Sequence, residues 1–307
     1  MKKFLLFAAA VVLATGCVDN DYDLENEDFE DFEIGNSDTE FRLPLATITV
    51  KGDAIGGTYD SLENIFNEAD TWTPSEYKEL SLTKLANKDQ AYLDKIITDL
   101  LADVKTDAAK RRDVIDRIVA SSSYANAINS SMPKNPQTGE PLYSIEDYID
   151  NHFDEFEEDS RDVLYEIVDK HLESLTTCIS SITQELKGFN IDEGVINALA
   201  NNSESLKIYG TVKSALPIDC IGNFSLATRG EEGRELFGTP LNMNYGKITD
   251  IDVNISGDGL RGLVEDMDLT VSFAPTTYYP RNTLPGDDDN AVEMELKIYK
   301  KGGLNFN

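Results

Sequence analysis

The sequence predicts an α+β protein: an antiparallel β-sandwich with a helical region inserted after its first strand. Apolar residues recur at helical spacing within residues 60–189 and at every second position from about Leu206 onward. A strand-like segment at residues 41–51 precedes the helices and has no partner near it in the sequence. Because a lone strand is not stable, we expect it to pair with strands of the C-terminal region, which makes the helical region an insertion.

The first strand contains a change of phase. Ile48 and Val50 alternate with polar residues, whereas Leu43 and Leu45 fall in the opposite phase beside Pro44. Proline cannot donate a ladder hydrogen bond, so within sheets it is confined to edge strands and bulges. The segment therefore predicts an edge strand or a β-bulge.

The longest helix of the insertion is expected to begin after Ser144, where Ser144-Ile145-Glu146-Asp147 has the spacing of a capping box. Helical spacing continues to Leu186, and Lys187-Gly188 is typical of a helix C-terminus. We therefore expect one continuous helix over residues 145–187, separated by a loop at residues 130–141 from two shorter helices. The apolar stripes of these two are Tyr92, Ile96, Leu100 and Val104, and Ala108, Ile115, Ile118 and Val119.

The C-terminal region is expected to be β-structure, because twelve of the twenty glycines follow Leu206 and alternation replaces helical spacing. The predicted strands are residues 206–213, 224–228, 250–255, 267–273 and 292–298. With the first strand they form enough half-buried surface for a two-layer antiparallel sandwich.

These patterns divide the chain into five segments. They are a signal peptide (1–16), an acidic disordered tether (17–40), the first strand of the β domain (41–57), a helical insertion (58–205) and the β-sandwich region (206–307).

The first residues have the order of a secretory signal peptide. Lys2 and Lys3 are followed by an apolar run at residues 4–13 and by the small residues Ala14-Thr15-Gly16. The apolar run is too short to span a bilayer, which requires about 20 residues. We expect the segment to be removed on export.

The segment Leu13-Ala14-Thr15-Gly16-Cys17 resembles the lipobox of bacterial lipoproteins. The resemblance implies cleavage before Cys17 and attachment of lipid to that cysteine, which would hold the protein on the outer membrane. The lipobox usually has leucine three residues before the cysteine, and this chain has Ala14 there. An ordinary secretory peptide with an unrelated cysteine is the alternative.

Residues 18–40 contain eleven acidic residues and no Lys or Arg, which predicts an extended tether. A cysteine followed by acidic residues and by Tyr22-Asp23-Leu24-Glu25-Asn26 is similar to the start of surface lipoproteins of Bacteroides-type bacteria. This resemblance covers about the first fifty residues and implies a location at the cell surface. A solvated linker on the periplasmic face is the alternative.

Charge argues against nucleic acid as a partner, because the formal net charge is −30 and phosphate binding requires clustered Lys and Arg. The one basic cluster is interleaved with aspartates and is interpreted as a salt-bridged helix face. It comprises Lys105, Lys110, Arg111, Arg112 and Arg117.

The candidate site residues are few. Tyr278 and Tyr279, between two prolines, could form an exposed stacking surface for a ligand, with packed tyrosines as the alternative. Cys178 and Cys220 could form a disulfide, because an exported chain permits one, with two ordinary buried cysteines as an equally simple account. We expect no catalytic residues and no cofactor.

Metal binding is not expected either. His171 falls on the apolar stripe of the long helix and is interpreted as a packed residue, and His152 with Glu155 supplies only two ligands. The oxygen-rich run Asp287-Asp288-Asp289-Asn290 could attract calcium, but the spaced ligands of an EF-hand are missing, so a solvated turn is favoured.

These observations favour a lipid-anchored surface lipoprotein with a non-catalytic structural, adhesive or interaction role, whose partner would be a protein or glycan outside the cell. A glycan- or peptide-binding module is the first alternative. A hydrolase that uses two carboxylates is the second.

Overall fold

The computed structural model confirms the α+β class and the antiparallel sandwich. The structure describes residues 32–51, 62–178, 181–188, 192–201, 205–229, 233–282 and 291–306.

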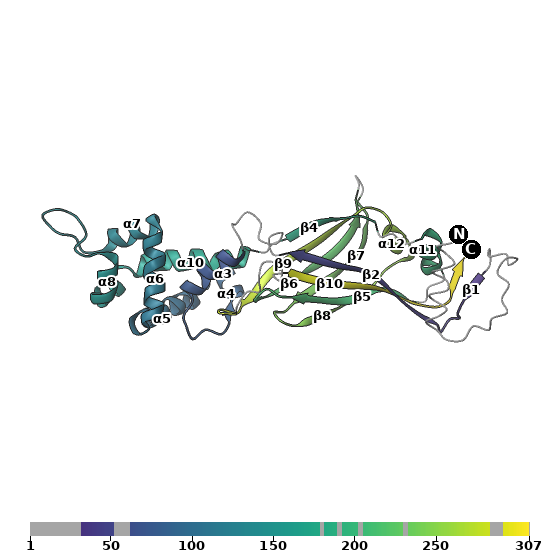
Figure 1. Cartoon of the computed structure of the whole chain (residues 1–307), viewed down its shortest axis with the longest axis horizontal. Helices are drawn as coiled ribbons and strands as arrows, with labels where there is room; N and C mark the ends of the chain where they lie inside the picture. Colours follow the sequence, from purple (N-terminus) through teal and green to yellow (C-terminus); the bar gives the residue numbers. More distant parts are fainter. Residues whose placement is uncertain are drawn as a thin grey trace.

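Two sheets form the sandwich, and their strands pair antiparallel throughout (Figure 1). The first has the order β2 (Glu40–Lys51), β10 (Ala291–Lys301), β5 (Ser205–Ser214) and β8 (Ile248–Asn254). The second has the order β3 (Leu80–Ser81), β9 (Met267–Tyr278), β6 (Ile218–Thr228) and β7 (Glu235–Met243), and β4 (Ser181–Leu186) also pairs with β9.

The core of the sandwich follows from alternation along the strands, because successive side chains point to opposite faces of a sheet. In β10 the residues of one face are buried and those between them are exposed; the buried ones are Val292, Met294, Leu296 and Ile298. The second sheet buries the corresponding face of β9, which comprises Met267, Leu269, Val271 and Phe273. Strands far apart in the sequence thus form one core.

Both predictions for the first strand are confirmed. Among the described strands, β2 pairs only with β10, and it lies at the edge of its sheet. The register shifts where Leu296 faces Ala46 and Lys297 faces Pro44, so Leu45 is the extra residue of a bulge. The bulge accounts for the change of phase in the sequence.

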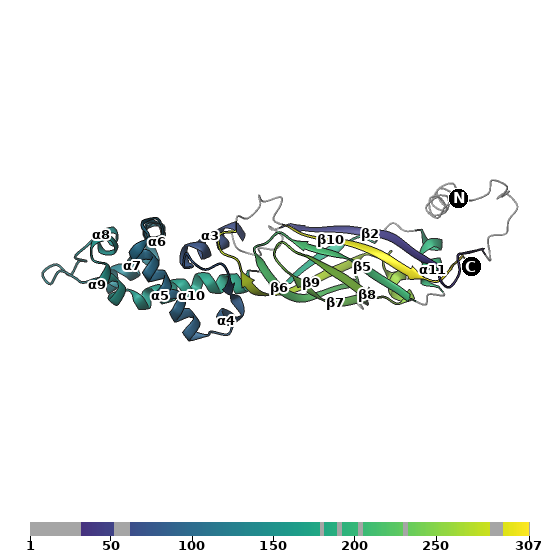
Figure 2. The ribbon, with the colours of Figure 1, turned by 90° about the horizontal axis from the view of Figure 1, so that it is seen from below.

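The helices of the insertion lie together at one end of the molecule, next to the sandwich (Figures 1 and 2). They are α3 (Leu62–Trp72), α4 (Leu82–Ala86), α5 (Gln90–Thr106), α6 (Ala108–Ala120), α7 (Ser122–Ser131), α8 (Ile145–Asn151), α9 (Phe153–Asp159) and α10 (Arg161–Thr177). The predicted shorter helices are confirmed as α5 and α6. Across the described ranges, no helix combines the length and apolar character that crossing a membrane requires.

The prediction of one long helix is wrong. Its start is confirmed, because the Ser144 side chain accepts a hydrogen bond from the Asp147 backbone N–H. The helical path is then interrupted at His152 (φ −124°, ψ 39°) and again at Ser160 (φ −102°, ψ 0°). The chain folds there so that the Tyr148 ring meets Phe156 edge to face, with centroids 5.7 Å apart.

The predicted end of that helix at Lys187-Gly188 is also wrong, because α10 ends at Thr177 and residues 181–186 form β4. Ile182 and Leu186 are four positions apart, a spacing that suits one face of a helix and one face of a strand alike. Pairing with Val271 and Met267 of β9 selects the strand.

The predicted tether is corrected in its last part. Within residues 17–40, β1 (Phe32–Ile34) pairs with β11 (Leu304–Phe306); residues 17–31 lie outside the described ranges. Two short helices accompany this end, α11 (Glu193–Ala200) and α12 (Gly257–Gly262). Figure 1 shows β1, β11 and α11 at the end opposite the helical insertion.

A buried lysine joins α11 to the sandwich. The alternation of β10 turns Lys300 inward, where its side chain is 0% exposed. Its Nζ donates to the carbonyl oxygens of Ala198 (2.8 Å) and Asn201 (2.6 Å) at the end of α11. These carbonyls have no partner within the helix, and their dipoles favour a cation.

We expect the free energy of unfolding to rise as the pH increases from about 8 toward 10.5, because burial lowers the pKa of Lys300 from 10.5 to about 8. Within this window the unfolded chain binds a proton that the folded protein has released, so folding becomes more favourable with pH. Urea unfolding at several pH values measures the slope.

Lys300→Met should make this slope shallower. The matched control is Lys297→Met, which removes an exposed lysine from the same strand and should leave the slope as in the wild type. Equal slopes for Lys300→Met and the wild type would contradict the assignment.

Candidate functional site

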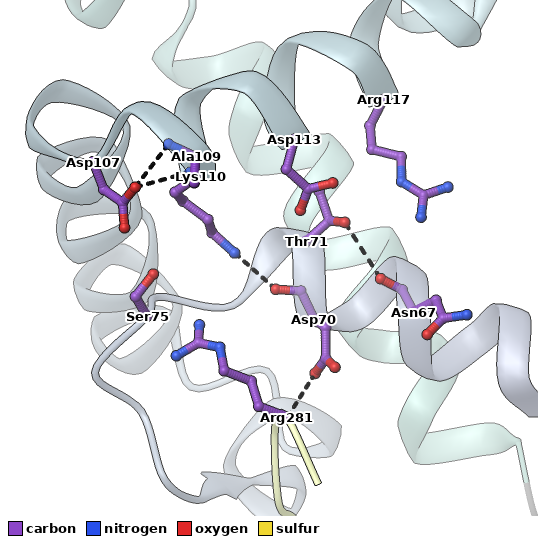
Figure 3. Close-up of a pocket in the computed structure, with 10 residues that line it drawn as sticks. All are labelled: Asn67, Asp70, Thr71, Ser75, Asp107, Ala109, Lys110, Asp113, Arg117 and Arg281. Carbon is purple, nitrogen blue, oxygen red and sulfur yellow. Dashed lines mark hydrogen bonds between the residues drawn. The ribbon is translucent and has the colours of Figure 1, made fainter. Parts of the chain in front are cut away.

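A polar pocket lies between α3, α6 and the turn that follows β9 (Figure 3). Its volume is about 390 Å³. The lining residues are Asn67, Asp70, Thr71, Ser75, Asp107, Ala109, Lys110, Asp113, Arg117 and Arg281. Because these residues are more than 200 positions apart at the extremes, the site exists only when the insertion is docked on the sandwich.

The start of α6 positions Lys110 in the pocket wall. The Asp107 carboxylate accepts hydrogen bonds from the backbone N–H groups of Ala109 (2.8 Å) and Lys110 (3.2 Å), as an N-cap does. Lys110 is only 7% exposed, and its Nζ donates to the Asp70 carbonyl oxygen at 2.8 Å. Burial, with the nearby Arg281 adding to it, lowers the pKa of Lys110 to about 8.

Asp70 connects the insertion to the sandwich. It lies in the last turns of α3, and its carboxylate accepts from the Tyr278 hydroxyl at the end of β9 and from the Arg281 backbone N–H (3.3 Å). Burial and the Asp70 carboxylate raise the pKa of Tyr278, so its hydroxyl stays protonated and donates. One side chain thus orients the strand end and the turn against the helix.

Arg281 has an uncommon backbone conformation. Its φ of 62° lies in the left-handed region, where a side chain is crowded by the backbone. The residue is exposed, and its guanidinium extends into the pocket beside Ser75 and Lys110 (Figure 3). Among the described residues, the Arg281 side chain has no hydrogen-bond or ion-pair partner.

The predicted stacking surface at Tyr278 and Tyr279 does not form. Tyr278 is 1% exposed and stacks on Phe66 with centroids 5.5 Å apart. Tyr279 is half-buried and donates to the Asp219 carboxylate at 2.7 Å. Consecutive residues at a strand end face opposite sides, which separates the two rings. Tyr278 therefore supports the pocket from beneath, through Asp70, and offers no surface to a ligand.

The interpretation of the basic cluster as a salt-bridged face is confirmed for four of its members. The ion pairs are Lys105–Asp154 (2.8 Å), Arg111–Asp150 (3.5 Å), Arg112–Glu146 (2.5 Å) and Arg117–Glu68 (2.6 Å). Lys110 is the exception, because it is buried in the pocket wall. Lys110 is buried while its neighbours form ion pairs, because it lies on the side of α6 that faces α3.

His171 is a packed residue, as predicted. Its ring stacks on Trp72 with centroids 5.9 Å apart, and its Nε2 lies 2.6 Å from the Tyr124 hydroxyl. Burial lowers the pKa of His171 to about 4, so the ring is neutral at physiological pH. His152 stacks on Tyr143 at 3.8 Å.

Within the described ranges, no group of three or more His, Cys, Asp or Glu residues has the arrangement of a metal site. The oxygen-rich run Asp287–Asn290 lies outside those ranges, so a calcium site there stays untested.

Cys178 and Cys220 are both buried. Cys178 closes α10 and its Sγ donates to the Leu175 carbonyl oxygen at 3.1 Å. Burial raises the pKa of the Cys220 thiol, and the charge of Cys178 adds to this effect. The bridge stays a prediction, which a mass lower by two hydrogens in non-reduced protein would support.

Sequence reasoning missed the pocket. Lys110 carries no signal that separates it from its neighbours in the basic cluster. Arg281 follows Pro280 in a turn-like segment, and nothing in that segment places it near α6. Only the docking of the insertion brings the two cations together.

We expect Tyr278→Phe to lower the free energy of unfolding by about 1.5–3 kcal/mol, because it removes a hydrogen bond to a charged group. Urea unfolding measures the loss. Tyr279→Phe is the matched control: it removes the hydroxyl that donates to the half-buried Asp219, where water can replace it, so its effect should be smaller. Equal losses in the free energy of unfolding for the two variants would contradict a larger contribution from the hydrogen bond to Asp70.

No protein-family model matches the chain, and no curated protein matches it. Among solved structures, it is similar to a protein of Parabacteroides distasonis described as secreted, at 13% identity and a TM-score of 0.26, over 40% of this chain and 38% of that one. It is also similar to a CBM4 carbohydrate-binding module, at 12% identity and a TM-score of 0.17, over 41% of this chain and 60% of that one. The chain spans less than two thirds of either structure, and at these TM-scores the similarity does not extend to function.

Proposed function

We propose that this protein is a lipid-anchored surface protein that acts by binding, without catalysis, and presents its helical insertion away from the membrane. Lipid on Cys17 would hold it to the outer membrane, and residues 18–31 would connect that anchor to the folded body. The partner would lie outside the cell.

The arrangement along the long axis carries this proposal. The chain enters the described structure at Phe32 in β1, beside β11 and α11 (Figure 1). The sandwich follows, and the helical insertion lies at the opposite end in both views (Figures 1 and 2). An anchor N-terminal to β1 would therefore place the sandwich as a spacer and the insertion outermost.

The sequence before β1 supports the anchor. A basic start, an apolar run and small residues precede Cys17. Each buried methylene of an attached lipid contributes about 0.8 kcal/mol, and stable attachment takes more than one anchoring signal. A multiply acylated cysteine meets this requirement.

A ligand-binding role for the insertion is favoured by one specific observation. The pocket at Lys110 and Arg281 is a concave polar site of about 390 Å³, within the size range of small-molecule sites, about 300–1,000 Å³. This supports a glycan- or peptide-derived ligand over a purely structural role.

We expect trypsin added to intact cells to cut the protein at Lys134. This residue is exposed in the loop between α7 and α8, at the end farthest from β1 (Figure 1), so an outward-facing insertion offers it to the protease. Mass spectrometry of the released peptides identifies the cleavage, and Lys134→Gln shows that the site is specific.

Cys17→Ala is the control for the anchor, and we expect this variant to be lost from the membrane fraction. A wild-type protein that resists trypsin until the outer membrane is broken would contradict surface display. Retention of Cys17→Ala on the membrane would contradict the lipid anchor.

A further inference from the structure

We propose that the pocket between α3, α6 and the turn after β9 binds a small ligand that carries a carboxylate, held by Lys110 and Arg281. This inference rests on the proposed binding function and names the chemistry that the pocket recognises. It depends on which charged groups around the pocket already have partners within the protein (Figure 3).

Two of the three acidic side chains of the pocket already have partners. Asp107 accepts from two backbone N–H groups of α6, at 2.8 and 3.2 Å. Asp70 accepts from the Tyr278 hydroxyl and from a backbone N–H of the turn after β9. The third, Asp113, has no hydrogen bond or ion pair with the residues that the structure describes, and its charge acts on Lys110. Among these three carboxylates, only that of Asp113 lacks a hydrogen-bond donor in the described part of the chain.

The cations of the pocket are less fully paired. Arg117 is bound to Glu68 at 2.6 Å. Lys110 donates to one carbonyl oxygen, that of Asp70, so two of its three N–H groups remain. The guanidinium of Arg281 has no partner in the described part of the chain. The formal charges of the lining balance, with three acidic and three basic side chains. Lys110 and Arg281 nevertheless keep N–H groups that have no acceptor among the described residues.

These adjacent N–H donors match a single carboxylate better than other ligand groups. A guanidinium binds a carboxylate through two parallel hydrogen bonds, and an ammonium adds a compact positive charge. A phosphate would bring more negative charge close to Asp113 and Asp70. A neutral sugar would leave the charges of Lys110 and Arg281 unpaired as it displaced water from them.

The rest of the lining indicates a small polar acid. Asn67 and Ser75 offer hydrogen-bonding side chains, and Asp113 can accept from a hydroxyl or an ammonium group. The pocket of about 390 Å³ is at the small end of the range for ligand sites. A sugar acid and an amino acid share the required carboxylate and hydrogen-bonding groups.

The positive φ of Arg281 allows a variant that tests binding without disturbing the fold. At φ 62° a glycine is unstrained, whereas an arginine is crowded. The turn itself would therefore form at least as well with glycine. Arg281→Gly removes the guanidinium without opposing the fold, which makes it the informative variant.

The test is isothermal titration calorimetry of the purified full-length protein with sodium glucuronate, glucose and sodium glutamate. Glucuronate and glucose share a hydroxyl-bearing ring and differ by the carboxylate. We expect glucuronate or glutamate to bind at least about tenfold more tightly than glucose, as for a hydrogen bond to a charged group.

Arg281→Gly should weaken binding of the acid at least about tenfold. The matched control is Lys88→Gly, because Lys88 is the other non-glycine residue with a positive φ (54°) among those described. It also loses one positive charge, but its Nζ is bound to Glu173 at 2.6 Å, away from the pocket. This variant should bind as the wild type does.

Preference for glucuronate supports the proposal and identifies a sugar acid, and preference for glutamate supports it and identifies an amino acid. Equal binding of glucose and both acids, or no binding of either acid, overturns it. Unchanged acid binding by Arg281→Gly also overturns it. Trypsin cleavage on intact cells depends on Cys17 and not on the pocket, so failure here is distinguishable from failure of surface display.

Discussion

The pairing of β2 with β10 is the constraint on which the fold depends. These strands come from opposite ends of the described chain and pair over eleven positions. Closing so long a segment has an entropic cost that grows slowly with length, and burial of the inner face of β10 offsets it. The helices between β2 and β4 lie together at one end of the resulting sandwich (Figure 1).

The insertion is joined to the sandwich by contacts that also build the pocket. β3 pairs with the end of β9, and the Tyr278 hydroxyl of that same strand end donates to Asp70 of α3. The turn after β9 is thereby held against α6, where Arg281 and Lys110 line one pocket. Docking of the helices on the sandwich therefore brings Arg281, the one lining residue outside the insertion, into the pocket.

The sequence predicted those elements whose pattern has a single interpretation. The bulge at Leu45 and the inner face of β10 followed from alternation, and α5 and α6 followed from apolar stripes at helical spacing. The prediction of one long helix was wrong at Ile182 and Leu186, whose spacing suits a helix and a strand equally. Pairing with β9 selects the strand there. The pocket could not be predicted, because Lys110 resembles its salt-bridged neighbours until α3 covers it.

The sequence by itself determined the α+β class, the sandwich with a helical insertion after its first strand, and the expectation of a lipid anchor at Cys17. These features depend on local periodicity and on short motifs. Only the tertiary structure decided that Tyr278 is buried while Tyr279 is half-buried, and that Lys110 and Arg281 line the same pocket. Such outcomes depend on which surfaces are buried against each other, and local spacing does not carry that information.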